Sequence, residues 1–171
     1  MFNKKLQDAF NEQLNAELYS AYLYVSMAAY FESISLQGMA NWMQIQAQEE
    51  MQHAAKFFAF INERDGRVLL SQIQGPETKW DSPLAVFENV CTHESHVTSL
   101  INGLVDLAIR EKDHAANAFL QWFVTEQVEE EASAKEVTDK LKLAGDNASV
   151  LFMIDQELAQ RTLTPTPTAQ A

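Results

Sequence analysis

The feature that most constrains this chain is a carboxylate and an imidazole placed inside an apolar helical stripe. The stretch Gln44–Phe58, QIQAQEEMQHAAKFF, has helical periodicity, and the stripe that includes Met43 and Phe57 should face a core. The same seven-residue pattern places Gln46, Glu50 and His53 on the buried face, with the carboxylate and the imidazole one turn apart. Burying an ionised carboxylate is costly unless its charge is compensated. A metal ion would compensate it, and Glu-x-x-His is a suitable ligand spacing.

The chain is predicted to be all-α. Its 171 residues suffice for one domain with a full core, and it contains only 5 Gly and 4 Pro. Gly145 should end the fourth helix and Asp146 should cap the fifth. We expect a domain over residues 1–161 and a disordered tail over residues 162–171, TLTPTPTAQA. The predicted helices cover about residues 4–32, 38–64, 83–110, 114–144 and 147–160.

Connection lengths predict the topology. Short turns make the first and second helices, and the third and fourth, antiparallel hairpins. Helices of this length span about 40 Å, whereas the extended segment 66–83 can cover up to about 60 Å. We therefore predict an up-down-down-up four-helix bundle with one long crossover between the second and third helices.

An internal repeat places polar residues at one level of that bundle. Glu17 and Glu50 are 33 positions apart, and so are Glu94 and Gln127. Adding 77 to Glu17, Glu50 and His53 gives Glu94, Gln127 and Glu130. Each hairpin thus presents one lone Glu in an apolar stripe and one polar pair at i, i+3.

A lone Glu in such a stripe usually extends its carboxylate to solvent, and a lone buried His is usually a core residue with a satisfied hydrogen bond. The combination weakens these structural interpretations, because acidic groups at one level repel one another. Such a cluster persists in a core only with cations or shared protons. Carboxylates with one imidazole suit iron or manganese.

These motifs resemble those of the bacterial non-haem ferritins. The resemblance covers all of the chain except the tail and rests on ELYSAYLY around Glu17, QEEMQH around Glu50, Glu94 itself, and WFVTEQVEEE. It implies a ferritin-like four-helix bundle with a ferroxidase centre, in which Glu from two helices joins a polar pair from each of the others. The residues implied are Glu17, Glu50 and His53 for one iron, Glu50, Glu94 and Glu130 for the second, Gln127 beside them, and Tyr24 and Trp122 as aromatic neighbours.

A run of acidic residues lies one step around the helices from this centre. In most proteins a run such as EQVEEE is a solvated face, yet its like charges at i, i+3 and i+4 weaken a helix by a few tenths of a kcal/mol each. The resemblance implies a third iron site formed by Glu49, Glu126, Glu129 and Glu130. A haem is not expected: Met51 fits helix packing, and Gln127-x-x-Glu130 stands where bacterioferritins carry a second Glu-x-x-His.

Other residues receive structural interpretations. Cys91 is expected to be a small core residue, and as the only cysteine it excludes an internal disulfide. His93 and His96 are expected at the surface or an interface. The acidic iron-entry channel of animal ferritins is in doubt, because Asn117 and Leu120 lie in the corresponding stretch.

The resemblance implies an iron-storage protein that oxidises Fe(II) with O2 or H2O2 and keeps Fe(III) as mineral inside a twenty-four-subunit shell. The alternatives are a catalytically silent shell subunit and a di-iron oxidase that acts on an organic substrate. A net charge of −12 argues against nucleic-acid binding, and the sequence shows neither a signal peptide nor a membrane span, so we expect a cytoplasmic protein. The fifth helix is expected to contact symmetry mates through a stripe formed by Val150, Leu151, Ile154 and Leu158.

Overall fold

The computed structural model describes residues 2–163, and the predicted disorder of residues 164–171 lies outside the described part of the chain. Five helices and no strand occur in the described residues, which confirms the all-α prediction. None of these helices is long and apolar enough to cross a membrane. The helices are α1 (Lys4–Ser33), α2 (Gln37–Glu63), α3 (Pro83–Arg110), α4 (His114–Ala144) and α5 (Ala148–Leu158).

Local signals explain where α4 and α5 meet. Gly145 ends α4 in a backbone conformation with φ of 52°, which glycine adopts without a steric penalty. The prediction that Asp146 caps α5 is wrong. Asn147 directly precedes the first helical residue, and its side-chain oxygen accepts hydrogen bonds from the backbone N–H groups of Ser149 (3.0 Å) and Val150 (3.3 Å). The helix ends at Leu158, two residues before the predicted end.

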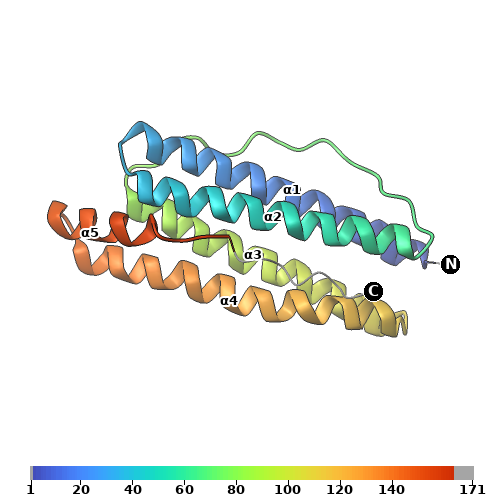
Figure 1. The fold of residues 1–171 in the computed structure, drawn as a ribbon. Coiled ribbons are helices and arrows are strands. Elements are labelled where there is room, and N and C mark those ends of the chain that lie inside the picture. The colour runs from blue at the N-terminus through green and yellow to red at the C-terminus, as the bar shows by residue number, and fades with distance from the viewer. Residues whose placement is uncertain (1, 164–171) are drawn as a thin grey trace.

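The long crossover has the predicted path. Figure 1 shows residues 64–82 running along α1, so that α2 and α3 begin at the same end of the bundle. Amide side chains of α1 bind its backbone: Asn11 Oδ1 accepts from Leu69 N–H (2.7 Å), and Asn15 Oδ1 accepts from Ser71 N–H (3.0 Å). These contacts satisfy peptide groups of a segment that has no regular partner.

The core is divided into two apolar clusters along the bundle axis. One lies towards α5 and includes Met27, Phe31 and Phe87. The other lies towards the N-terminus and includes Phe10 and Phe57. Between them is a set of buried polar side chains that we call the polar layer, formed by Glu17, Tyr24, Gln46, Glu50, His53, Glu94, Gln127 and Glu130.

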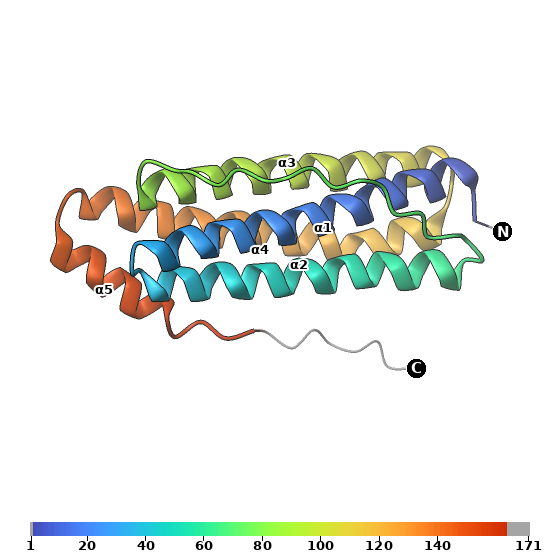
Figure 2. The ribbon, with the colours of Figure 1, turned by 90° about the horizontal axis from the view of Figure 1, so that it is seen from above.

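Helix α5 lies across the end of the bundle where α1 meets α2 (Figure 2). It docks on the N-terminus of α2, which lacks a side-chain cap of its own. Asp155 Oδ1 accepts from Met39 N–H at 2.9 Å, which places a carboxylate at the positive end of the helix dipole. A Cβ on Gly38 would lie 1.6 Å from the Asp155 carbonyl oxygen, so this close approach requires glycine.

This docking corrects one expectation about α5. Ile154 and Leu158, assigned to contacts with other subunits, are buried in this chain's own core, and Leu151 packs against the same cluster. The expected contact face was therefore wrong for Leu151, Ile154 and Leu158 but not for Val150, because the apolar periodicity cannot show which partner covers it. The large apolar side chains that α5 leaves exposed are Val150, Phe152 and Met153.

Candidate metal centre

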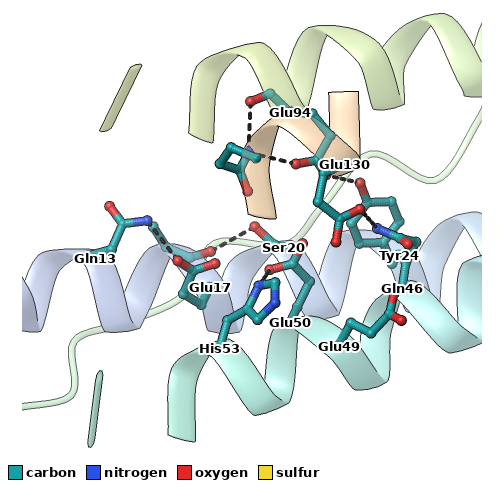
Figure 3. A network of polar contacts seen from close by, with 12 residues as sticks. Gln13, Glu17, Ser20, Tyr24, Gln46, Glu49, Glu50, His53, Glu94 and Glu130 are labelled. Carbon is teal, nitrogen blue, oxygen red and sulfur yellow. Dashed lines mark hydrogen bonds and ion pairs between the residues drawn. The ribbon is translucent and has the colours of Figure 1, made fainter. Parts of the chain in front are cut away.

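The polar layer is contributed by all four long helices. Every member is at most 5% exposed, and Figure 3 shows the carboxylates and the imidazole converging between the helices. The polar-layer residues lie within the apolar stripes of their helices, so the helical periodicity that forms the core also buries their side chains. Seven of the eight residues named for the di-iron centre from the sequence belong to this layer, and the eighth, Trp122, is half-buried beside it.

The α1–α2 hairpin forms one half of the layer. Ligand atoms of Glu17, Glu50 and His53 all lie within 4.8 Å of one another, and all three side chains are buried. Glu17 Oε1 accepts a hydrogen bond from Gln13 Nε2 at 2.9 Å, whereas Oε2 of Glu17 and Oε2 of Glu50 are buried without a hydrogen-bond partner. Glu50 Oε2 lies 3.3 Å from His53 Nδ1. Two buried carboxylate oxygens that form no hydrogen bond, next to an imidazole nitrogen, suit a cation.

The α3–α4 hairpin forms the other half, and its carboxylates are hydrogen-bonded. The Tyr24 hydroxyl donates to Glu94 Oε1, and Gln127 Nε2 donates to Glu94 Oε2 at 3.2 Å. Glu130 Oε2 accepts from Gln46 Nε2 at 2.8 Å. Glu94 is therefore directed at its hydrogen-bond donors, and it does not belong to either group of ligand atoms that lie within 4.8 Å.

Burial is the largest cause of the raised pKa of each carboxyl group in the layer. It raises the pKa of Glu17 and Glu50 well above the ordinary range, and neighbouring carboxylates add to both shifts. Burial and then the charge of Glu94 raise the pKa of Glu130 to about 7, and burial also raises the pKa of Glu94. For Glu17, Glu50 and Glu130, repulsion between carboxylates, the cause inferred from the sequence, ranks second to desolvation as a cause of the raised pKa.

Tyr24 stays a hydrogen-bond donor. Burial and then the charge of Glu94 raise the pKa of its hydroxyl well above the ordinary range. The neutral phenol can therefore hold Glu94 at neutral pH. Trp122, expected as the second aromatic neighbour, packs edge-on against His53 with 5.4 Å between ring centroids.

The acidic residues assigned to a third site are only partly brought together. Ligand atoms of His53, Glu126 and Glu130 lie within 4.8 Å of one another, so Glu126 adjoins the polar layer. Glu129 is exposed. Glu49 is half-buried, and its Oε2 accepts a hydrogen bond from Arg161 at 2.7 Å.

The sequence interpretation placed Gln46 on the buried face but missed two supporting residues, Gln13 and Arg161. Gln13 lies four positions before Glu17, just as Gln46 lies four positions before Glu50, and this signal would have identified it. Nothing in the sequence indicated Arg161, because it stands at the boundary of the predicted tail.

His93 also differs from expectation. It is half-buried, and its Nε2 lies 2.8 Å from the Ser20 hydroxyl oxygen within a shared hydrogen bond. Burial, with the charge of His96 second, lowers the pKa of His93 to about 4, so the ring is neutral at pH 7. His96 is exposed, as expected, and Cys91 is half-buried beside the Thr138 hydroxyl at 3.2 Å rather than fully within the core.

The donor set fits hard or borderline divalent cations. Carboxylates outnumber imidazoles, and the described centre includes no thiolate. Binding a cation would satisfy the unpartnered oxygens of Glu17 and Glu50 and release the protons that burial retains.

Comparisons with known proteins agree with this architecture. Residues 7–144 match the family model Ferritin, described as a ferritin-like domain. The chain is 48% identical over 161 residues to a bacterial non-heme ferritin of Bacteroides fragilis, covering 94% of this chain and 100% of that protein. It is 42% identical over 162 residues to a bacterial non-heme ferritin of Staphylococcus saprophyticus, covering 95% and 97% of the two chains.

Solved structures are similarly close. An Archaeoglobus fulgidus ferritin engineered into a closed form superimposes with a TM-score of 0.95 at 53% identity, covering 96% of this chain and 100% of that one. The open-pore ferritin of the same archaeon superimposes with a TM-score of 0.94 at 52% identity, covering 95% and 100%. The chain is thus similar to these proteins over the whole bundle, including α5.

Proposed function

This chain belongs to the ferritin family, and from that premise we propose that it oxidises Fe(II) to Fe(III) with O2 or H2O2 at a di-iron centre within each subunit and stores the product as mineral in a shell. One observation carries the proposal: Glu17, Glu50 and His53 come together in the core, and Glu17 Oε2 and Glu50 Oε2 are buried there without a hydrogen bond. A merely structural polar layer would satisfy such oxygens with hydrogen bonds.

In this proposal Fe(II) is the substrate, and each hairpin contributes half of the centre. Glu17, Glu50 and His53 hold one iron, and Glu50 also serves the second, together with Glu94 and Glu130. Gln127 and Tyr24 position Glu94. Two adjacent irons allow an oxidant to take one electron from each.

The buried carboxyl groups change their protons and hydrogen bonds as iron binds and leaves. Burial keeps protons on the centre when it is free of metal, and these protons leave as Fe(II) enters, so uptake should be coupled to proton release. On the α3–α4 side, Glu94 exchanges its bonds from Tyr24 and Gln127 for iron. These hydrogen bonds can re-form when Fe(III) leaves, which resets the site.

Storage requires a route from the centre to a mineral and a wall around it. We propose that Glu126, beside His53 and Glu130, begins that route, with Glu49 and Glu129 completing a third iron site. Clustered carboxylates on the inner wall would then collect cations for nucleation. The net charge of −12 is consistent with this role.

We also propose that the chain assembles into the twenty-four-subunit shell implied by the resemblance, and that it acts in the cytoplasm. The relevant face of α5 is the exposed one, where Phe152 and Met153 are 62% and 69% exposed. Large apolar side chains side by side at a surface are typical of an interface.

The test of the function is anaerobic loading with Fe(II) followed by addition of O2 or, separately, H2O2. We expect a transient di-iron(III) absorbance, followed by iron retained in a particle of shell size in analytical ultracentrifugation. Rapid oxidation without retained iron would instead support an oxidase for an organic substrate. Absence of iron-dependent oxidant consumption would support the silent subunit.

A further inference from the structure

Arg161 connects the end of α5 to the proposed iron sites. Its Nη2 donates to Glu49 Oε2 at 2.7 Å and also to Gln46 Oε1. Gln46 in turn donates to Glu130 in the polar layer. One guanidinium therefore contacts a residue proposed for the third iron site and, through one amide, a residue of the di-iron centre.

The surroundings hold this guanidinium firmly in place. It stacks over the Trp42 ring at 4.5 Å, and its side chain is 21% exposed. The segment after α5 continues beside α2 (Figure 2), and Asn41 Nδ2 donates to the backbone oxygens of Leu158 (3.2 Å) and Arg161 (3.1 Å). The contact with Glu49 is therefore an anchored ion pair rather than a loose surface pair.

The ion pair between Arg161 and Glu49 leaves part of the guanidinium without a hydrogen bond, which favours its exchange with a cation. Arg161 Nη1 is buried and has no hydrogen-bond partner, so the guanidinium is only partly satisfied where it lies. Glu49 is 12% exposed in its side chain and has this guanidinium as its ion-pair partner. A cation at Glu49 would place a second positive charge beside a partly desolvated one, which is strongly unfavourable.

We propose that Arg161 is a positioning residue that occupies the place of a cation at Glu49, and that a metal ion must displace it to complete the third site. The inference rests on the proposed function, because that function assigns Glu49 to an iron site. Displacement frees the guanidinium from Gln46 as well, so metal entry at Glu49 also loosens the segment at residues 159–163. Filling of the third site is thereby coupled to the end of α5.

The first test uses Zn(II), which binds without oxidation chemistry. Isothermal titration calorimetry of the assembled protein should show that Arg161→Gln raises the affinity of the weakest class of Zn(II) sites by about tenfold, equivalent to about 1.4 kcal/mol. Arg161→Lys, which keeps the charge but loses the fork, should fall between the two proteins. In a Glu49→Gln background, Arg161→Gln should have no such effect.

Lys140→Gln is the matched control. Lys140 of α4 also joins α5 to the bundle, by an ion pair with Glu157 (2.6 Å), and it pairs with Glu136 of its own helix (2.7 Å); its loss changes the net charge equally. It contacts neither Glu49 nor Gln46 in these pairs, so its Zn(II) titration should match that of the wild type. An equal gain in affinity in Lys140→Gln would reduce the effect to net charge and overturn the proposal.

The second test is hydrogen–deuterium exchange of the backbone at residues 159–163. Zn(II) should speed this exchange in the wild type, and Glu49→Gln should speed it without metal. Unchanged or weaker Zn(II) binding in Arg161→Gln, or unchanged exchange in metal-free Glu49→Gln, would overturn the proposal. Failure of the proposed function is recognised by a separate comparison. If Glu17→Ala and His53→Ala each bind as many Zn(II) ions as the wild type, the proposed di-iron centre is wrong, whatever the result for Arg161.

Discussion

The two hairpins place the same polar repeat at the same level of the bundle, yet the buried carboxylates of the two hairpins differ in their hydrogen bonding. On the α1–α2 side, Glu17 and Glu50 each leave one buried oxygen without a donor. On the α3–α4 side, Glu94 and Glu130 are held by hydrogen bonds from neutral partners. The carboxylates of the α1–α2 half therefore have oxygens available to coordinate an ion, whereas the carboxylates of the α3–α4 half already accept hydrogen bonds.

This difference indicates an order of binding. A cation entering the first half replaces unfavourable desolvation with coordination and breaks few contacts. A cation entering the second half must compete with the donors on Glu94 and Glu130. We therefore expect unequal affinities for two irons in one centre, with the α1–α2 half filled first.

The largest effect should follow from disabling the first half. Glu50→Ala and His53→Ala should each slow rapid Fe(II) oxidation by about 100-fold or more, since each removes a direct ligand, a larger loss than that of an outer-shell partner. Stopped-flow absorbance after O2 addition measures this rate.

The same position also separates a metal site from a structural one. Glu50→Gln should leave the thermal stability of the metal-free protein unchanged or raised, because a buried carboxyl with an unpartnered oxygen becomes a neutral amide. The core truncation Leu14→Ala, by comparison, should cost about 2–5 kcal/mol. Strong destabilisation by Glu50→Gln would show that Glu50 makes a stabilising contact in the metal-free protein, contrary to the difference described between the two halves.

The next effect is the pH dependence of stability that Glu130 causes in the α3–α4 half. The pKa of Glu130 is raised to about 7 from an ordinary 4.5, so its protonated form favours folding. This contribution is complete below pH 4.5 and is lost as pH rises through about 7. The free energy of unfolding of the metal-free protein should fall by roughly 2 kcal/mol across that window, and less in Glu130→Gln.

Denaturant titrations at several pH values check this, with metal excluded by chelator. Fe(II)-loaded protein under anaerobic conditions should reverse the trend, because deprotonated ligands bind the ion more tightly as pH rises. Equal pH slopes for the wild type and Glu130→Gln would show that another group controls this window.

A smaller effect is expected from Tyr24→Phe. Removing the hydroxyl deprives Glu94 of one of its two side-chain donors and should destabilise the metal-free protein by about 1–2 kcal/mol. Iron-loaded protein should lose less, because the ion then holds Glu94. Thermal unfolding of both forms measures the difference, with Tyr22→Phe, at a half-exposed position, as the control.

The smallest effect should come from outside both halves. Glu129→Ala should change the later phase or the total amount of Fe(II) oxidised while sparing the first fast phase, since this residue is exposed. Glu136→Ala, another exposed acidic change on α4, provides the control. Loss of the fast phase in Glu129→Ala would place Glu129 in the primary centre.

The periodicity of the sequence was sufficient for the fold and for the membership of the polar layer. Four helices of 27 to 31 residues share one core, so the apolar stripes interrupted at Glu17 and Glu94 place both carboxylates inside it. The repeat can show that Gln13 and Gln46 lie in or beside the layer, but it cannot show which carboxylate each amide binds, because that depends on rotamers rather than register. Arg161 was also beyond prediction, since its contact with Glu49 spans 112 positions and depends on where α5 docks.

The division of the centre between two hairpins has a consequence for how the molecule folds. Each half of the repeat lies within one hairpin, α1 with α2 or α3 with α4, whose members are joined by a short turn. Contacts between neighbours in sequence form quickly, whereas closing the crossover at residues 64–82 has a larger entropic cost. Glu17, Glu50 and His53 can therefore meet on a single hairpin during synthesis, before α3 and α4 have left the ribosome.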